Sequence, residues 1–377
     1  MTDNNKYILA LDIGGTNPRL AMMQILGANE FKIVEVMEAK SDSNSIIPII
    51  NTFLQQCGTK GYTTNTCVIS VAGPIDNNSC SKPTNAKFPI IDTEIINNTH
   101  LSNVKVINDF AAIGEAVATI QNPSDDKRIK CLTNVSPNKN GHRGIIGPGT
   151  GLGVSYLTNT AQGFFVHESE GGHAGFPTSG NYDLLFRFLQ NKLNINQIGT
   201  ESLVSGQGIR HIIDFLTQNP KEFLEMLKND INFFEDIVKI EHEKNPSLSD
   251  EQIKLAILGE QSNNIKVDIA ALIATNIENN PKANLTMRLF TVFLGSAAQS
   301  VALNGATTGG LFIAGGIAEK NMHLFEGDDF LRSFHDNWKP NIKEFLKKIP
   351  VYIINDYDIS FYGCARVAVM SFDRKIE

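Results

Sequence analysis

Long apolar runs, clustered positive charge and closely spaced cysteine pairs are missing from this sequence of 377 residues. No apolar stretch approaches the roughly 20 residues of a membrane-spanning helix, and the first residues lack the basic and apolar regions of a signal peptide. Lysine and arginine form no cluster, and the net charge is −7 at pH 7, so a nucleic-acid partner is not expected. The five cysteines have no C-x-x-C spacing, which is typical of reduced thiols in the cytosol. We therefore expect a cytoplasmic protein that binds neither nucleic acid nor membrane.

The composition, with 42% hydrophobic and 19% charged residues, is typical of a soluble globular protein. At this length the chain exceeds one ordinary hydrophobic core, so two domains are expected. The first part reads as three successive strands followed by alternating helices and strands. The expected strands span 7–13, 20–25, 31–38, 67–71 and 104–107, and the expected helices 46–54 and 110–120.

The second part opens in a similar way, with expected strands at 144–146 and 153–157 on either side of a glycine turn. Two such hairpins in comparable positions indicate a duplicated topology, although the two halves are too different in sequence to be a repeat. Residues 180–300 read as mainly helical, and a capping box at 249–252 predicts a helix start. The segment 219–246 is rich in lysine and glutamate and reads as a solvated surface segment without an assigned function.

A short buried strand is expected at 311–314, and a final helix at 359–372 is expected to pack back on the first domain. The predicted division is therefore a small α/β domain formed by residues 1–120 with 356–377, and a large α/β domain formed by residues 121–355.

Two glycine-rich turns, at 12–17 and 147–153, have the composition of phosphate-binding loops. Glycine lets backbone N–H groups approach a triphosphate closely, and a carboxylate such as Asp12 is suited to holding Mg²⁺ through water. A dinucleotide-binding fingerprint would lead from a strand into a helix, whereas both turns lead from strand to strand. A Walker motif is excluded because neither turn contains Gly-Lys-Ser/Thr. Ordinary hairpin turns are the remaining alternative.

Asp109 follows an expected strand and precedes an expected helix. From position alone, a helix N-cap is the simplest interpretation, because Asn and Asp are common at helix starts. A carboxylate at a strand end is also rigid enough to act as a general base in phosphoryl transfer. The two roles are compatible, since the backbone can begin the helix while the carboxylate faces a ligand.

Five motifs together resemble the bacterial-type glucokinases, which belong with the sugar kinases, actin and Hsp70-type ATPases. In chain order they are Asp12-Ile-Gly-Gly-Thr-Asn17, Ile107-Asn-Asp-Phe110, Gly149-Thr-Gly-Leu-Gly153, Glu170-Gly-Gly-His173 and Phe312-Ile-Ala-Gly-Gly316. The resemblance covers nearly the whole chain. It implies two actin-like ATPase domains of ribonuclease H-like α/β fold flanking a cleft, ATP and Mg²⁺ as cofactors, and phosphorylation of glucose at its 6-hydroxyl in glycolysis, by a homodimer.

The resemblance also implies roles for individual residues. Asp109 would be the general base, and Asp12 would hold Mg²⁺ through water. The residues implied to bind ATP are Asp12, Gly14, Gly15, Thr16, Asn17, Gly149, Thr150, Gly151, Gly315 and Gly316. The residues implied to bind the sugar are Asn85, Asn108, Asp109, Glu170, His173 and Glu201. Pro18 departs from the family pattern, which usually has a small residue there.

Several alternatives stay open at this point. His167, Glu168, Glu170 and His173 are also the residue types of a zinc site, but the cysteine-rich loop that accompanies zinc in related sugar kinases is missing. A sugar-sensing transcription regulator would need an added helix-turn-helix, for which there is no room before Asp12. Actin and Hsp70-type proteins lack the sugar motifs. A kinase for another hexose, such as mannose or fructose, is poorly distinguished from a glucokinase.

Overall fold

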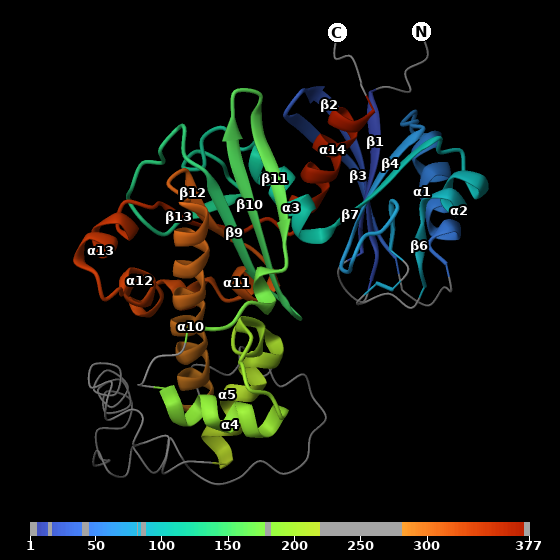
Figure 1. Cartoon of the computed structure of the whole chain (residues 1–377). Helices are drawn as coiled ribbons and strands as arrows, with labels where there is room; N and C mark the ends of the chain where they lie inside the picture. Colours follow the sequence, from blue (N-terminus) through green and yellow to red (C-terminus); the bar gives the residue numbers. More distant parts are fainter. Residues whose placement is uncertain are drawn as a thin grey trace. The chain divides into compact units, whose positions relative to one another are not determined.

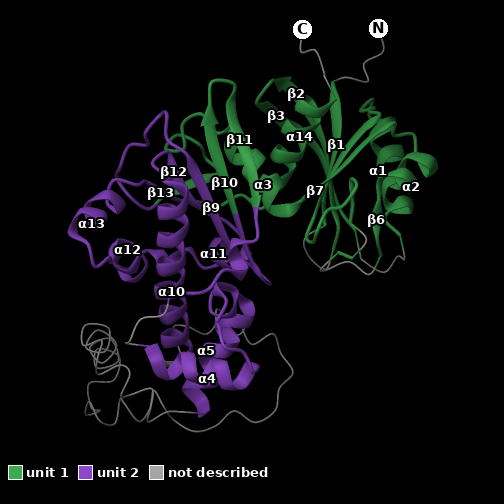
Figure 2. Ribbon diagram, in the orientation of Figure 1, with its two compact units in different colours: residues 1–131, 155–168, 354–377 green, residues 132–154, 169–353 purple. Residues whose placement is uncertain are grey.

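The computed structural model describes residues 6–13, 17–39, 45–80, 82–83, 88–177, 182–218 and 281–372, and Figure 1 shows the course of the chain. The expected surface segment at 219–246 and the capping box at 249–252 lie outside these residues. Two compact units are present, coloured in Figure 2. Unit 1 consists of residues 1–131, 155–168 and 354–377, and unit 2 of residues 132–154 and 169–353. The domain division made from the sequence stays a prediction.

Unit 1 contains a five-stranded sheet in the order β3-β2-β1-β4-β7. Strands β1, β2 and β3 pair antiparallel, whereas β1, β4 and β7 run parallel. The strands are β1 (Tyr7–Ile13), β2 (Arg19–Gly27), β3 (Glu30–Glu38), β4 (Thr66–Val71) and β7 (Asn103–Asn108). All five were expected from the sequence, because each is an apolar run of strand length bounded by turn residues.

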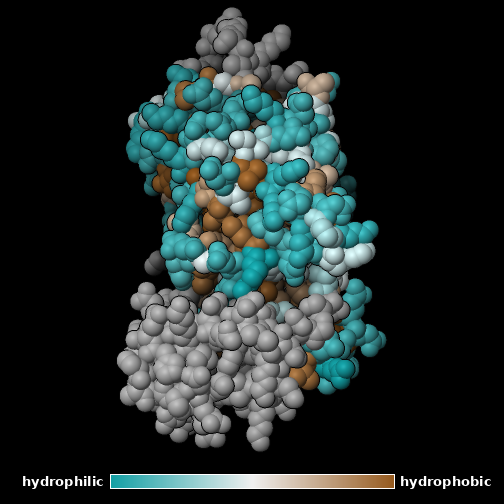
Figure 3. Space-filling model, turned by 90° about the vertical axis from the view of Figure 1, so that its left-hand side faces the viewer, coloured by the Kyte–Doolittle hydropathy of each residue, from teal (hydrophilic) through white to brown (hydrophobic). Residues whose placement is uncertain are grey.

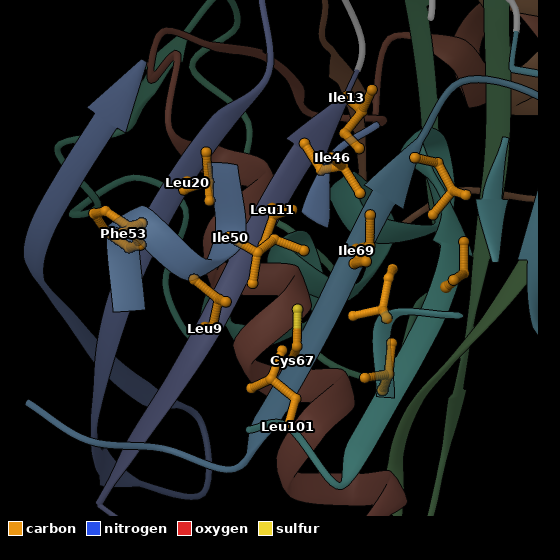
Figure 4. Close-up of a cluster of buried hydrophobic side chains, with 14 of the residues drawn as sticks. Leu9, Leu11, Ile13, Leu20, Ile46, Ile50, Phe53, Cys67, Ile69 and Leu101 are labelled. Carbon is orange, nitrogen blue, oxygen red and sulfur yellow. The ribbon is translucent and has the colours of Figure 1, made fainter. Parts of the chain in front are cut away.

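Alternate residues of β1 enter two separate cores, as the two-residue period of a strand requires. Leu9, Leu11 and Ile13 point into one core, together with Ile50 and Phe53 of α1 (Ile47–Thr59), as Figure 4 shows. On the other face, residues such as Ile8 and Ala10 pack against the helices α3 (Asp109–Thr119) and α14 (Ile359–Ser371). Because both faces are covered, β1 is apolar along almost its whole length.

The remaining elements of this part of the chain are short. They are β5 (Ser79–Cys80), β6 (Ile90–Ile91) and α2 (Asp92–Asn98). The final helix α14 contacts α3, β1, β2 and β4, which confirms the expectation that the last apolar segment returns to the first domain.

A six-stranded sheet has the order β11-β10-β9-β12-β13-β8. Its strands are β8 (Ile129–Cys131), β9 (Arg143–Pro148), β10 (Leu152–Thr160), β11 (Gly163–Ser169), β12 (Gly310–Ile313) and β13 (Val351–Ile354). Strand β12 pairs parallel with both β9 and β13, so the carboxyl ends of these three strands share one edge. The expected hairpin around the second glycine turn and the expected strand at 311–314 are thus confirmed.

The described helices of unit 2 confirm the helical reading of 180–300 where it is covered. Those within this range are α4 (Asp183–Leu193), α5 (Gly206–Gln218) and α10 (Pro281–Gly305), and three more helices follow, α11 (Gly316–Lys320), α12 (Asp329–His335) and α13 (Pro340–Leu346). Of the helices within the described ranges, none has the length and apolar character to cross a bilayer. The described surface in Figure 3 is mostly hydrophilic, with apolar residues gathered in one patch near its middle.

Two helical glycines differ in the space around them, and their substitution by alanine separates packing from helix propensity. A Cβ on Gly363 of α14 would overlap the carbonyl oxygen of Ala112 in α3, whereas a Cβ on Gly58 of α1 would meet nothing within 4 Å. We expect Gly363→Ala to lower the free energy of unfolding by about 1–3 kcal/mol because the two helices must separate. Gly58→Ala is expected to be neutral or to stabilise by up to about 1 kcal/mol. Urea denaturation measures both, and equal effects would contradict the close packing of α3 and α14.

Candidate functional site

The parallel strands of unit 1 bring two of the predicted site residues to one edge of the sheet. Asp12 pairs with Ser70 of β4, and Ser70 pairs with Ile107 of β7. Asp12 therefore lies at the carboxyl end of β1, in the same row as the end of β7. Asp109 follows two residues after Ile107, as the first residue of α3. Ligands of open α/β sheets bind at such carboxyl edges.

The N-cap of α3 is Asn108 and not Asp109, which corrects the simplest interpretation from the sequence. The Oδ1 atom of Asn108 accepts hydrogen bonds from the backbone N–H groups of Phe110 (2.9 Å) and Ala111 (3.3 Å). Its Nδ2 group donates to the carbonyl of Gly73 at 3.4 Å. Because Asn108 satisfies the first N–H groups of the helix, the carboxylate of Asp109 is not needed as a cap.

The carboxyl group of Asp109 has a perturbed protonation equilibrium. Burial raises its pKa from 3.8 to about 6, and the nearby negative charge of Asp12 acts in the same direction. Hydrogen bonds to the carboxylate, including one from the N–H of Phe110 to Oδ1 at 3.0 Å, oppose the increase in pKa without cancelling it. A carboxyl group with a pKa near neutrality in a polar edge site is a candidate for proton transfer.

Asp12 is held by a buried arginine that the sequence reasoning missed. Its Oδ2 atom accepts hydrogen bonds from Arg19 Nη2 (2.5 Å) and from Ser360 Oγ (3.0 Å). Arg19 also donates to Asp358 Oδ1 at 2.7 Å and to the carbonyl of Tyr357 at 2.8 Å. Its guanidinium lies 3.7 Å from the centre of the Tyr357 ring. The positive charge compensates the carboxylate at the strand end and ties it to the start of α14.

The signal that could have identified Arg19 is its place in the sequence. It opens an apolar strand directly after the first glycine turn, and the structure places it, 6% exposed, opposite Asp12 in the antiparallel pairing of β1 and β2. A charged side chain in a buried strand needs a partner of opposite charge. An arginine at the start of an apolar strand therefore indicates that a carboxylate lies close to it.

The rest of the first glycine turn is described only in part. Gly14, Gly15 and Thr16 lie outside the described residues, as does the predicted sugar residue Asn85. Asn17 is exposed, and its Nδ2 group donates to Glu38 Oε1 at 2.9 Å.

The second glycine turn connects β9 and β10 in unit 2. The N–H of Gly149 donates to the carbonyl of Gly151 at 2.8 Å, which closes the turn, and Thr150 is exposed at its tip. The turn leads from strand to strand, as predicted, which excludes the dinucleotide-binding fingerprint at this position. It presents a short stretch of backbone that carries little side-chain bulk.

Gly315 and Gly316 lie beside the second glycine turn. Strand β12 runs parallel to β9, and the N–H of Ala314 donates to the carbonyl of Ile146 at 2.9 Å. Gly315 has a φ of +90°, and a Cβ there would lie 2.7 Å from the carbonyl oxygen of Pro148. A side chain is therefore excluded on both grounds. A Cβ on Gly316 would meet nothing within 4 Å, so the space above this glycine is open.

Glu170 precedes a short 3-10 helix (Gly171–His173) and His173 is its last residue, and both side chains point into solvent. Their side chains are 87% and 67% exposed, and His173 Nε2 lies 3.7 Å from Glu170 Oε2. His167 instead pairs with Thr158 Oγ1 at 3.0 Å. Among the described residues, which include all four candidates for a zinc site, no three His, Cys, Asp or Glu side chains are grouped to hold a metal ion.

Glu201 contacts the second glycine turn directly. It lies in a 3-10 helix (Thr200–Ser202), and its Oε2 atom accepts a hydrogen bond from the N–H of Leu152 at 2.8 Å. Leu152 is the residue that follows the turn. The sequence suggested Glu201 only as a sugar contact and gave no sign of this bond, which joins residues 49 positions apart.

Comparisons with known proteins agree with the motifs from which these residues were selected. The glucokinase family profile matches residues 9–371, nearly the whole chain. The chain belongs to the glucokinase family. A glucokinase from Nostoc punctiforme is 31% identical over 366 residues, which cover 96% of this chain and 98% of that protein.

Solved structures of glucokinases share the fold over the same extent. A glucokinase from an Antarctic psychrotroph matches with a TM-score of 0.72 and 25% identity, covering 96% of this chain and 98% of the other. A glucokinase from Balamuthia mandrillaris, solved in complex with glucose, matches with a TM-score of 0.67 and 21% identity over 96% and 93% of the two chains. The chain therefore has the α/β fold of the actin-like sugar kinases, as predicted.

Removal of the Arg19 charge is expected to destabilise the fold strongly. In Arg19→Met, the carboxylate of Asp12 keeps its burial but loses its counter-charge, which costs about 3–5 kcal/mol for a buried pair. The control is Arg332→Met, because Arg332 pairs with Asp329 but has a side chain that is 39% exposed. The control should lose less than about 1 kcal/mol. Equal losses of unfolding free energy in chemical denaturation would show that the Arg19 network stabilises the fold no more than an exposed ion pair does.

Asp109→Asn is expected to stabilise the protein at neutral pH. The folded-state pKa of about 6 exceeds the usual 3.8, so the folded state binds more protons between these values and its stability falls as the pH rises through this window. Above pH 6 the charged carboxylate carries the full penalty, and the neutral amide removes about 1–2 kcal/mol of it. Urea denaturation at pH 4.5 and pH 7.5 measures the difference. A gain that is the same at both pH values would contradict the raised pKa.

Proposed function

We propose that this glucokinase-family protein transfers the γ-phosphoryl group of ATP to the 6-hydroxyl of glucose, giving glucose 6-phosphate and ADP. The observation that carries the proposal is the partly buried carboxyl of Asp109, with its raised pKa, at the carboxyl edge of the unit 1 sheet. Phosphoryl transfer needs an aligned hydroxyl, a group that receives its proton and fixed donors around the phosphates.

Asp109 would receive the proton of the 6-hydroxyl as that oxygen attacks the phosphorus. A pKa of about 6 leaves the group mostly ionised at neutral pH and still basic enough to take a proton in the transition state. The hydrogen bond from the N–H of Phe110 and the start of α3 fix the direction of the carboxylate. A base that is positioned in this way spends little free energy on orientation during the reaction.

The phosphates of ATP would be bound by the two glycine turns, through Asp12, Gly14, Gly15, Thr16 and Asn17 in the first and Gly149, Thr150 and Gly151 in the second. Backbone N–H groups in such turns suit an anion. Gly315 and Gly316 would lie under the adenosine. The support for this last role is the open space above Gly316 and its place beside the second turn.

Mg²⁺ would be held at Asp12, through water. Oδ2 of Asp12 is occupied by Arg19 and Ser360, while no hydrogen bond within the described ranges uses Oδ1. One carboxylate fits the usual Mg²⁺ site, in which phosphate oxygens and waters supply most ligands. The bound ion would neutralise charge on the transferring phosphates, while Arg19 keeps Asp12 in place.

The hexose would be bound by Asn85, Asn108, Asp109, Glu170, His173 and Glu201. The exposed side chains of Glu170 and His173 are accessible to a ligand, and carboxylates and imidazoles bond readily to sugar hydroxyls. Asn108 would contribute through Nδ2, because its Oδ1 caps α3. Glucose is proposed as the preferred hexose, and a coupled assay with mannose and fructose beside glucose tests that preference.

A cytoplasmic location and a homodimeric state are also proposed. Four of the five cysteines are buried, Cys131 is exposed, and all five are free thiols, which suits a reducing compartment. The homodimer rests on the family resemblance, and light scattering of the purified protein tests it.

Asp109→Ala is expected to lower kcat by roughly 10²-fold or more, the usual effect of losing a general base, while ATP binding is retained. The matched control is Asp183→Ala. Asp183 is also the first residue of a helix, α4, but it is exposed and outside the proposed site. A coupled assay for ADP release measures kcat, and circular dichroism confirms the fold. If Asp109→Ala keeps kcat within about threefold of the control, Asp109 is not the base.

A further inference from the structure

Glu201 is placed to contact two ligands with one carboxylate. Its Oε2 atom accepts the hydrogen bond from the N–H of Leu152, at the end of the second glycine turn. Gly151 leaves the space for this contact, because a Cβ there would lie 2.5 Å from Oε2. Glu201 is only partly buried, and its Oε1 atom forms no hydrogen bond with the residues that the structure describes. One oxygen therefore holds the turn and the other is available to a ligand.

The backbone around Glu201 ties the same turn at its other end. The N–H of Gly206 donates to the carbonyl of Gly149 at 2.9 Å, and the Oγ of Ser205 donates to the carbonyl of Glu201 at 2.7 Å. The segment 199–206 therefore holds the turn at Gly149 and at Leu152. A shift of Glu201 would therefore move the backbone between these two residues.

The segment 199–206 is also hydrogen-bonded to the segment that contains Glu170 and His173. The N–H and the hydroxyl of Thr200 both donate to the carbonyl of Ala174, at 2.8 and 2.9 Å. Gly172 packs so closely on the carbonyl of Leu152 that a Cβ would overlap it. The backbone segments that carry the proposed sugar residues of unit 2 are thus bonded to each other and packed on the end of the second glycine turn.

We propose that Glu201 couples hexose binding to nucleotide binding. This inference rests on the proposed function. A hexose hydroxyl that donates to Oε1 fixes the carboxylate, and Oε2 then holds the N–H of Leu152 and the turn in the conformation that receives the phosphates. The ligand that binds first orders the turn, and the second ligand then binds without that entropic cost. Each ligand therefore tightens the binding of the other by the same factor.

The test measures this factor by calorimetry. The ATP analogue AMPPNP is titrated with Mg²⁺ into the full-length protein, with and without saturating glucose. In the wild type we expect glucose to tighten AMPPNP binding by roughly fivefold or more, within the usual range of such couplings. In Glu201→Ala, glucose binds more weakly, and at saturating glucose the factor falls to within about twofold of one.

The matched control is Glu170→Ala. Both carboxylates are proposed sugar contacts, but the side chain of Glu170 is 87% exposed, and within the described residues its side chain is paired only with His173. Its loss should weaken glucose binding and leave the coupling factor at the wild-type value. A purely structural role for Glu201 would leave glucose affinity unchanged in Glu201→Ala, which overturns the inference. A wild-type coupling factor in Glu201→Ala, or no coupling in the wild type, also overturns it.

Glu201→Gln decides the question if the alanine variant does not fold. Glutamine keeps the volume but replaces one carboxylate oxygen by an NH₂ group, so it cannot accept from Leu152 at one position and from a hexose hydroxyl at the other. Its coupling factor is expected to fall, and a factor equal to that of the wild type would contradict the inference. The proposed function is tested separately by glucose phosphorylation in the wild type. An active kinase without coupling refutes only the role of Glu201, whereas an inactive wild type refutes the function.

Discussion

Two carboxylates lie together at the edge of the unit 1 sheet where the parallel strands β1, β4 and β7 end. Asp12 lies near the carboxyl end of β1 and Asp109 begins α3, and the pairing of β1, β4 and β7 brings them near each other. Like charges at such a place are unfavourable, and the chain treats the two residues differently. Arg19 compensates Asp12 with a buried guanidinium, while Asp109 has no recorded cationic partner among the described residues and its pKa rises to about 6. Different environments thus give two aspartates different tasks.

The same arrangement accounts for the position of the last helix. Arg19 reaches Asp358 and the carbonyl of Tyr357, just before α14, and Ser360 in the first turn of that helix donates to Asp12. The C-terminal helix thereby fixes the residue proposed to hold Mg²⁺. In unit 2, close backbone packing fixes the second glycine turn in a similar way. Gly315 lies on the carbonyl of Pro148, and Glu201 holds the amide of Leu152, so neighbouring segments define the second glycine turn.

Much of this could be predicted from the sequence, because the relevant signals are local. The apolar runs at β1, β4, β7 and β12 are strands, and the strand-to-strand course of the second turn follows from the residues beside it. The helix start at Asp109 was also expected, although the choice of the capping residue was wrong. Asn and Asp both serve as N-caps, and only the geometry shows that Asn108 bonds to the free N–H groups.

The interactions that were missed are those between residues far apart in the chain. Arg19 and Asp358 are separated by 339 positions, and Glu201 and Leu152 by 49. No spacing rule connects such pairs, so the sequence alone gives neither the link from Arg19 to the start of α14 nor the bond to the second turn. The raised pKa of Asp109 was unpredictable for the same reason, because it depends on burial and on the position of Asp12.

The pH dependence of kcat/KM for glucose, at saturating nucleotide, is the most direct test of Asp109 as the general base. This ratio reports the ionisation of the enzyme before it binds glucose, in which Asp109 must be deprotonated to accept a proton. With Asp109 as the base, kcat/KM is expected to rise with pH through an apparent pKa of about 6 and then to level off. A profile that stays flat from pH 5 to pH 8, in a protein that remains folded over that range, would contradict the assignment of Asp109 as the base.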